Sequence, residues 1–423
     1  MLDLKIKNTR IHGHKDLMQI GCSQVKITEL CLHIQGEALE TIDARGYLVS
    51  PPFVDSHVHL DTSLTMGKPR FNLSGTLLEG IQIWSELKPD LTFEEIKARA
   101  KKLLFWSIAK GNLAVRSHVD TSDPSLMAVE ALVELKKEMA PLVDLQLVAF
   151  PQNGVMRHKE GMNNLVRALD KGLDLVGGIP HFEPTMALGR KSVRLLCELA
   201  EQRGMMVDMH CDESDDPLSR HIEDLAFETI RLGMEGRVAG SHITSMHSMD
   251  NYYVTKLLPL MAQAKISCIC NPLVNMNLLG RQDTYPKRRE LARVPELMAN
   301  KINVSLGHDD VMDHWYPMGT HDMLDAAHMG AHALHMTGIG QQESLFDAVT
   351  LNGARTLNLE GYGMKKGCNA DMIILQARSK LEAIRLRPVR LFVIRKGKII
   401  SQTTESFARV ESGQGQVKID FCP

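Results

Sequence analysis

The sequence predicts an α/β protein in which eight parallel strands and their helices close into a (β/α)8 barrel, with a small β-sandwich built from both termini. Two observations indicate this fold. Short apolar, β-prone runs alternate with amphipathic helical stretches through the middle of the 423-residue chain. Several of these runs end on polar side chains, and a parallel barrel carries its chemistry at the carboxyl ends of its strands.

The strand-like runs follow one another in regular alternation with helical segments. The first lies in YLVSPPFVDSHVHL (47–60), and the others cover 113–120, 145–152, 173–182, 205–213, 237–244, 266–272 and 302–310. The segment FEEIKARAKKLLFWSIAKG is a typical helix: Thr92 and Glu95 have capping-box spacing, and Gly111 is a stop signal. Eight such units without a shorter internal repeat predict a parallel barrel.

The two ends of the chain have a different pattern. Residues 1–48 and 362–423 contain short strand-like pieces, among them LDLKIKNTRI, DMIILQ and LFVIRKGKII, separated by turn residues. Because chain ends often lie together, we expect both segments to form one β-sandwich domain, and residues 49–361 to form the barrel.

Composition is typical of a large soluble enzyme. The chain is 44% hydrophobic and 24% charged, and its net charge of -2 gives no basic footprint for nucleic acid or an acidic membrane. Residues 1–20 are too polar for a signal peptide, there is no 18-residue apolar run, and the eight cysteines are interpreted as free thiols. We therefore expect a cytoplasmic homo-oligomer that binds a small molecule and neither nucleic acid nor membrane.

Histidines and acids at the strand ends predict a metal site. His57 and His59 alternate along one strand and so share a face, although a lone His-x-His could be two polar residues at a strand end. Together with His210 and Asp309 they form a chemically complete set, since imidazoles suit zinc or ferrous iron and a catalytic site keeps one position open for water. The pattern predicts a metal-dependent hydrolytic enzyme.

Longer motifs carry a resemblance over essentially the whole chain. FPQNG (150–154), HCDE (210–213), NPLVN (271–275), GRQDTYPKRR (280–289) and GHDDVMDHWYP (307–317) resemble the bacterial cytosine deaminases of the amidohydrolase superfamily. The resemblance implies a distorted (β/α)8 TIM barrel with a terminal β-sandwich and one divalent metal ion, Zn2+ or Fe2+. Many superfamily members hold two metals through a carbamylated lysine on the fourth strand, but this strand reads LVGGIPHF and has no lysine.

The resemblance also implies a reaction, hydrolytic deamination of a free pyrimidine base: cytosine to uracil and ammonia, or 5-methylcytosine to thymine. A metal ion lowers the pKa of bound water toward about 7. His242 would orient the resulting hydroxide, and Asp309, besides ligating the metal, would receive the water proton. Glu213 would protonate the ring. The alternative for Glu213, an ordinary carboxylate at a helix start, stays open.

Substrate contacts follow from the same motifs. The Gln152 carboxamide matches the N–H and C=O of a cyclic amide edge, although it could also cap a strand end. Asp310 and Trp315 correspond to pocket residues near C5 and C6 of the ring. Leu77, in a long connection over 61–90, is expected to close over the ring with Trp315. His118 and His181 are expected to pack around the site rather than to ligate.

Several alternatives remain at this point. FPQNG replaces the FPQEG that we expect, and HFEPTMALG after the fourth strand also departs from the pattern, so the substrate could be 5-methylcytosine, isoguanine or creatinine. A hydantoinase-like or dihydroorotase-like hydrolase of cyclic amides usually has the two-metal lysine site that is missing here. A non-enzymatic assembly protein would be expected to have lost its ligands.

Overall fold

The computed structural model describes residues 1–413 and 415–421. The chain divides into two compact units. One comprises Met1–Pro52, Ala109–Gly111 and Gly361–Pro423, and the other comprises Phe53–Ile108 and Asn112–Glu360. Among the described residues no helix has the length and apolar character needed to span a bilayer. Each cysteine that the structure describes is free.

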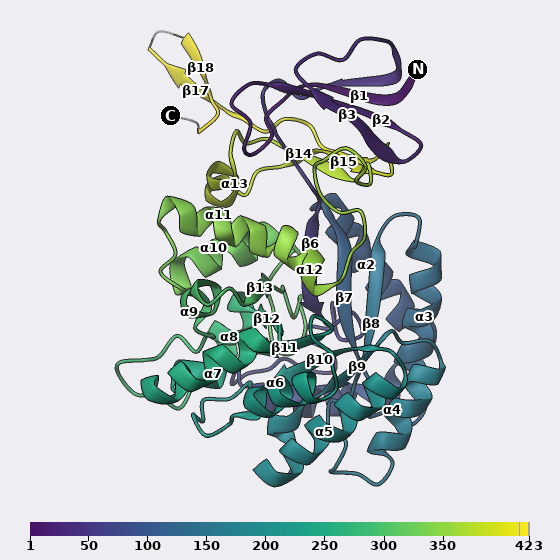
Figure 1. Ribbon diagram of the computed structural model, residues 1–423, viewed down its shortest axis with the longest axis vertical. Coiled ribbons are helices and arrows are strands. Elements are labelled where there is room, and N and C mark those ends of the chain that lie inside the picture. The colour runs from purple at the N-terminus through teal and green to yellow at the C-terminus, as the bar shows by residue number, and fades with distance from the viewer. Residues whose placement is uncertain (414, 422–423) are drawn as a thin grey trace. The chain divides into compact units, whose positions relative to one another are not determined.

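The larger unit is a parallel barrel of eight strands, as predicted (Figure 1). The strands are paired in sequence order: β6 (Phe53–Val58), β7 (Asn112–Asp120), β8 (Asp144–Phe150), β9 (Leu175–Gly178), β10 (Met206–Cys211), β11 (Val238–His242), β12 (Ser267–Cys270) and β13 (Asn303–Leu306). The fourth strand is shorter than the predicted 173–182. Pro180 lacks the N–H that a ladder needs, and Pro180–Phe182 forms the 3-10 helix η2 instead.

The first and last strands meet at their carboxyl ends. Val58 and Asp309 form an isolated parallel bridge. Asp309 N–H donates to the carbonyl of His57 at 2.8 Å, and His59 N–H donates to the carbonyl of Asp309 at 3.1 Å. Asp55 reinforces this junction, because its carboxylate accepts the backbone N–H groups of His57 and His308 at 3.1 and 3.0 Å. The barrel therefore closes through the residues predicted to bind metal.

Helices surround the strands of this unit (Figure 1). They are α1 (Leu77–Leu87), α2 (Phe93–Ala109), α3 (Met127–Met139), α4 (Gly161–Asp170), α5 (Met186–Gln202), α6 (His221–Arg231), α7 (Asn251–Gln263), α8 (Pro272–Leu278), α9 (Val294–Ala299), α10 (Met323–Ala333), α11 (Ile339–Ala348) and α12 (Leu351–Thr356), with 3-10 helices η1 (Lys88–Asp90) and η3 (Thr244–His247).

Helix α2 has the buried face and the end signals that its sequence predicts. Its buried residues Ile96, Ala100 and Leu103 recur every three to four positions and so share one face. Glu95 N–H donates to the Thr92 hydroxyl at 3.3 Å, as the capping spacing predicts. Gly111 has φ +82°, a left-handed conformation that favours glycine just past a helix end.

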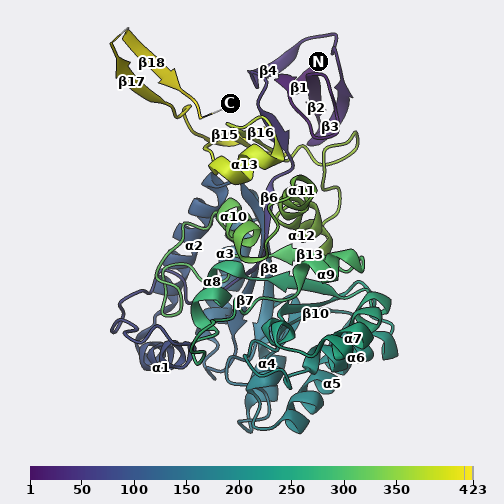
Figure 2. The same ribbon diagram turned by 90° about the vertical axis from the view of Figure 1, so that its left-hand side faces the viewer.

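The smaller unit is the expected β-sandwich of both termini (Figure 2). One sheet has the order β3-β2-β1-β4: β1 (Leu2–Thr9), β2 (Met18–Ser23), β3 (Lys26–Cys31) and β4 (Ala38–Asp43). The other has the order β16-β15-β14-β5: β5 (Leu48–Ser50), β14 (Met372–Leu375), β15 (Arg390–Arg395) and β16 (Lys398–Gln402). Leu4, Ile6, Ile20 and Ile374 are fully buried in its core. α13 (Lys380–Leu386) and the hairpin β17–β18 (Ala408–Ser412, Gly415–Ile419) complete the unit.

Candidate active site

Four ligand-type side chains converge where the barrel closes. His57 Nε2 lies 3.4 Å from Asp309 Oδ1, and His59 Nε2 lies 3.6 Å from the same oxygen. His59 Nε2 is also 3.1 Å from His210 Nε2. The four side chains come from the ends of β6 and β10 and from just beyond β13, although His210 is more than 150 residues from His59 in the sequence. The structure brings the whole predicted ligand set together.

The donor atoms of this cluster suit a divalent cation. Among the described residues, His57 Nε2 is buried without a hydrogen-bond partner, and such an orphan costs free energy unless something binds it. Burial, reinforced by neighbouring imidazoles, holds the pKa values of His57 and His210 well below the usual range, and burial lowers the pKa of His59 to about 4. The imidazoles are therefore neutral at pH 7, which is the form that ligates a metal.

A buried chain of hydrogen bonds orients the His57 ring. Its Nδ1 lies 2.9 Å from the Ser241 hydroxyl, and that hydroxyl donates to Asp208 at 2.7 Å. Arg116, with no exposed surface, donates to the other oxygen of Asp208 at 2.9 Å. Because Nδ1 is engaged in this way, Nε2 is the nitrogen of His57 left to face the cluster. The His118 ring packs against His57, with centroids 4.1 Å apart.

Glu213 and His242 lie beside the cluster and share a partner. Asn275 Nδ2 is 3.2 Å from Glu213 Oε1 and 3.0 Å from His242 Nδ1. Because the Asn275 amide donates to Nδ1 of His242, this nitrogen carries no proton, and the proton of the neutral ring is on Nε2. Burial raises the pKa of Glu213 to about 8, so this carboxyl carries a proton at neutral pH. The pair can hold protons close to the donor cluster.

Backbone strain marks the same place. His242 has φ +70°, and Asp309 also has φ +70°. Non-glycine residues in the left-handed region are uncommon, and they persist where the surrounding structure imposes them, often at functional sites. His242 ends β11 and Asp309 follows β13. At both positions the left-handed backbone departs from the regular strand conformation, and the side chain faces the site.

Three buried carboxyl groups, those of Asp309, Asp310 and Asp313, follow β13. Burial, followed by the nearby Glu213 carboxyl, raises the pKa of Asp309 well above its usual range. Burial also raises the pKa of Asp310, whose side chain is hydrogen-bonded to Asp313. Asp313 in turn accepts the backbone N–H of Trp315 at 3.0 Å. This contact fixes the loop that carries Asp310 and Trp315.

A cavity of about 230 Å³ opens onto the cluster. Besides Asp309 of the ligand set, its lining includes every remaining predicted site residue: Leu77, Gln152, Glu213, His242, Asp310 and Trp315. His181 also lines it, whereas His118 lies buried among the ligand rings. Leu77 belongs to α1, so the predicted 61–90 connection contains a helix. The Trp315 indole N–H donates to the carbonyl of Leu77 at 3.2 Å, which joins the helix start to the cavity wall.

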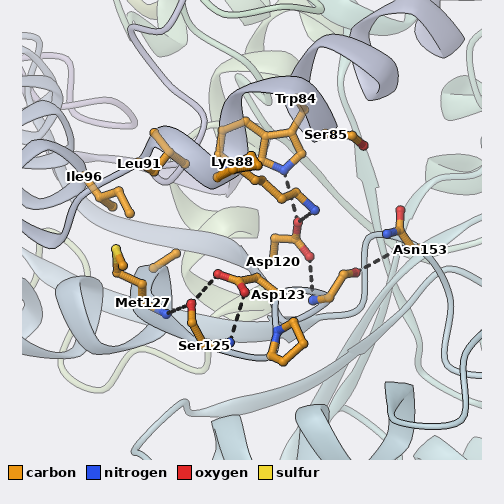
Figure 3. A pocket seen from close by; sticks show the side chains of 14 residues that line it. Trp84, Ser85, Lys88, Leu91, Ile96, Asp120, Asp123, Ser125, Met127 and Asn153 are labelled. Atoms are coloured by element: carbon orange, nitrogen blue, oxygen red, sulfur yellow. Dashed lines mark hydrogen bonds and ion pairs between the residues drawn. The ribbon is translucent and has the colours of Figure 1, made fainter.

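A larger cavity, of about 510 Å³, lies between η1 and the loop after β7 (Figure 3). Asp120 in its lining is already paired: Lys88 Nζ lies 2.5 Å from this carboxylate, and the Trp84 indole N–H donates to it at 3.0 Å. Nothing in it matches the donor cluster of the smaller cavity. We therefore place the chemistry in the smaller one.

Three supporting groups were not singled out from the sequence. Arg116 and Asp208 are charges inside apolar strands, a pattern that could have indicated a buried ion pair. Asn275 lies in the NPLVN motif. Its partners His242 and Glu213 are 33 and 62 residues away in the sequence, so these contacts cannot be derived from the spacing of residues within one element.

Comparisons with known proteins agree with this geometry. The amidohydrolase family model matches residues 40–401. The chain is 42% identical to 5-methylcytosine deaminase from Klebsiella pneumoniae, solved with 5-fluorocytosine, with a TM-score of 0.93 over 96% of this chain and 99% of that one. It is 29% identical to N-isopropylammelide isopropyl amidohydrolase from Pseudomonas sp. (strain ADP), over 94% of this chain and 97% of that protein.

A second solved structure has the same fold. N-isopropylammelide isopropylaminohydrolase from Burkholderia multivorans is 25% identical, with a TM-score of 0.83 over 95% of this chain and 99% of that one. The family model covers most of the chain, and the two structures extend over nearly all of it. This chain belongs to the amidohydrolase family.

Proposed function

We propose that this protein is a metal-dependent hydrolase that deaminates a free cytosine-type pyrimidine base, converting cytosine to uracil or 5-methylcytosine to thymine with release of ammonia. One observation carries the proposal. A cavity of about 230 Å³ is lined by His59, His210 and Asp309 of the donor cluster, by Glu213, whose pKa burial raises to about 8, and by the Gln152 carboxamide. The 42% identity to a 5-methylcytosine deaminase supports this substrate class.

His57, His59, His210 and Asp309 would hold one divalent ion, zinc or ferrous iron. Bound there, the ion would lower the pKa of a water molecule and supply a nucleophile at neutral pH. No lysine occurs in β9 (Leu175–Gly178), so the usual bridging group for a second metal is missing. We therefore propose a single-metal site, with imidazole as its main ligand type.

The residues around the ion would move protons. Asp309, which would be ionised as a ligand of the metal, would accept the proton that water loses as it adds to the ring carbon. Glu213 would give its proton to the ring nitrogen next to that carbon. The proton that Asp309 took from water would then be transferred to the amino group, which would leave as ammonia. His242, with its proton on Nε2, would donate a hydrogen bond to the attacking oxygen.

We propose one orientation for a pyrimidine bound in this cavity. Gln152 offers a donor and an acceptor that fit the N1 and O2 edge. Glu213 would then face N3, and Asp309 would lie beside C4, the carbon that loses its amino group. The remaining edge, C5 and C6, is left to Asp310 and Trp315. A methyl group on C5 would point at this wall.

The proposal can be tested on the purified, metal-loaded protein. Ammonia release and ultraviolet change would be measured on cytosine, 5-methylcytosine, isoguanine, creatinine, N-isopropylammelide and a hydantoin. We expect ammonia and the matching oxo-pyrimidine from at least one cytosine-type base. Ring opening of the hydantoin without deamination would instead support a cyclic-amide hydrolase. Turnover of isoguanine or creatinine alone would show that the substrate is one of those compounds rather than a cytosine-type base.

We further propose that catalysis belongs to residues 49–361 and that residues 1–48 and 362–423 form a separate sandwich domain. The residues of the donor cluster and its cavity all lie within Phe53–Ile108 and Asn112–Glu360, which supports this division. The expected setting is a cytoplasmic homo-oligomer, consistent with the free cysteines in the described part of the chain.

A further inference from the structure

Gly80 lies inside a helix that has no backbone need for glycine. It is the fourth residue of α1, and its backbone is not in the left-handed region. Glycine inside a helix is destabilising relative to alanine, because it loses more conformational freedom on folding. A packing reason for the missing side chain is therefore expected.

The packing reason is the Trp315 indole. A Cβ at position 80 would lie 2.5 Å from both Cδ1 and Nε1 of Trp315 and 3.0 Å from Cε2. Carbon atoms in proteins do not approach so closely, so the ring would have to move. The indole has little freedom to do so, because it is 6% exposed and its Nε1–H donates to the carbonyl of Leu77 at 3.2 Å.

The backbone of Trp315 is also held. Its N–H donates to Asp313 Oδ1 at 3.0 Å, and its carbonyl accepts from Asn277 Nδ2 at 3.0 Å. With the Trp315 backbone held, a side chain at position 80 would push the ring and α1 apart. The ring lines the same cavity as Gln152 and Glu213, so its displacement changes the space available to a bound base.

We propose that Gly80 is a specificity-determining position: by letting the Trp315 indole rest on α1, it sets the space for a substituent on C5 of the substrate ring. The inference rests on the proposed deaminase function. Gly80 itself touches neither substrate nor metal. It positions Trp315, and Trp315 forms the wall.

The test compares Gly80→Ala with Gly340→Ala. Gly340 also lies in the first turn of a helix, α11, but no atom lies within 4 Å of a Cβ built there. For Gly80→Ala we expect the ratio of kcat/KM for 5-methylcytosine to that for cytosine to change by about tenfold or more, since one methyl group in a pocket is worth a factor of about 10–200. Gly340→Ala should keep the wild-type ratio.

A second readout does not need turnover. Tryptophan would be replaced by 5-fluorotryptophan and the 19F resonances assigned with Trp315→Phe. Gly80→Ala should shift the Trp315 resonance and leave that of Trp106 unchanged, whereas Gly340→Ala should shift neither. The double variant Gly80→Ala/Trp315→Phe, with a smaller ring, should move the substrate ratio back toward that of Trp315→Phe alone.

An unshifted Trp315 resonance or an unchanged substrate ratio in Gly80→Ala would overturn the inference. If the wild type deaminates neither base, the proposed function fails, and the 19F shift still decides whether Gly80 positions the indole. Should Gly80→Ala not fold, a folded double variant would show that the clash with the indole is the cause. An unfolded double variant would contradict it.

Discussion

Among single residues, Glu213 offers a test of catalysis that does not depend on metal binding, because it lies outside the proposed ligand set. Glu213→Gln keeps the size and hydrogen bonding of the side chain but removes its transferable proton. We expect metal content to stay at the wild-type level while kcat falls by at least about 100-fold, as is typical for loss of a general acid. Steady-state kinetics and elemental analysis on one sample would check this. Near wild-type turnover in a metal-loaded variant would remove Glu213 from the mechanism.

Gln152 tests how the base is oriented. Gln152→Ala would leave a ring N–H and C=O unpaired in a closed site, and we expect a loss of about 1–3 kcal/mol in transition-state binding for bases that carry this edge. Trp315→Ala should instead reorder the preference between cytosine and 5-methylcytosine. Values of kcat/KM for both bases in both variants would decide. If Gln152→Ala cost no more than Trp315→Ala and left the ranking unchanged, the orientation would be wrong.

The site could be predicted from sequence where a residue's role follows from its own strand. His57 and His59 alternate on β6, and Asp309 follows β13, so their placement follows from barrel geometry. Asn275 and Ser241 differ, because their roles arise from contacts with residues 33 to 184 positions away. Gly80 is a similar case. Only the position of the Trp315 ring shows why a side chain is missing there.

At the scale of elements, α1 and η1 are fastened to the barrel through Asp120. This carboxylate, at the end of β7, accepts from Lys88 and from the Trp84 indole (Figure 3). Lys88→Met should loosen the segment 77–90, which carries Leu77 of the cavity wall. We expect faster amide exchange across 77–90 and a KM higher by about tenfold, or about 1.4 kcal/mol of binding free energy.

Lys101→Met is a suitable control for that variant. Lys101 is also a helical lysine in an ion pair, with the partly exposed Glu138, but it lies on α2 away from the cavity lining. Its removal should leave both exchange in 77–90 and KM unchanged. Unaltered exchange in Lys88→Met would show that Asp120 does not hold this segment.

For the whole molecule, we expect Glu290 to couple folding to pH. Its side chain is 1% exposed, and burial together with Asp215 raises its pKa to about 7, despite Arg288 at 2.9 Å. A raised carboxyl pKa favours the folded state below about pH 4.3, the unfolded value, and this contribution is lost as pH rises to 7. Glu290→Gln removes the titration, so its stability relative to wild type should increase over that range.

We expect this relative gain to be about 1–3 kcal/mol between pH 4.5 and 7.5, since one pKa unit corresponds to about 1.4 kcal/mol. Urea unfolding at the two pH values would measure it. Glu296→Gln, at an exposed glutamate in the neighbouring helix α9, should show no such trend. A stability difference between Glu290→Gln and wild type that is independent of pH would contradict the assignment.

The overall architecture was more accessible from sequence than its details. Apolar runs buried on both faces and capped helices are local signals, and the barrel and the sandwich both follow from them. The prediction for the fourth strand was too long, because the apolar run continues through Pro180, where the structure leaves the sheet and forms a 3-10 helix. The helix within 61–90 was missed, because α1 is stabilised by contacts with the distant residues Asp120 and Trp315. Expectations of a homo-oligomer and of a cytoplasmic location remain predictions.

We propose that one divalent ion, held by His57, His59, His210 and Asp309, supports deamination of a cytosine-type base. The most direct test is to strip the protein of metal and titrate it with Zn2+ or Fe2+ while recording ammonia release from cytosine and 5-methylcytosine. We expect no activity without metal and a linear rise that reaches a plateau at one equivalent per chain. Full activity in the metal-free protein, or a plateau only at two equivalents, would contradict it.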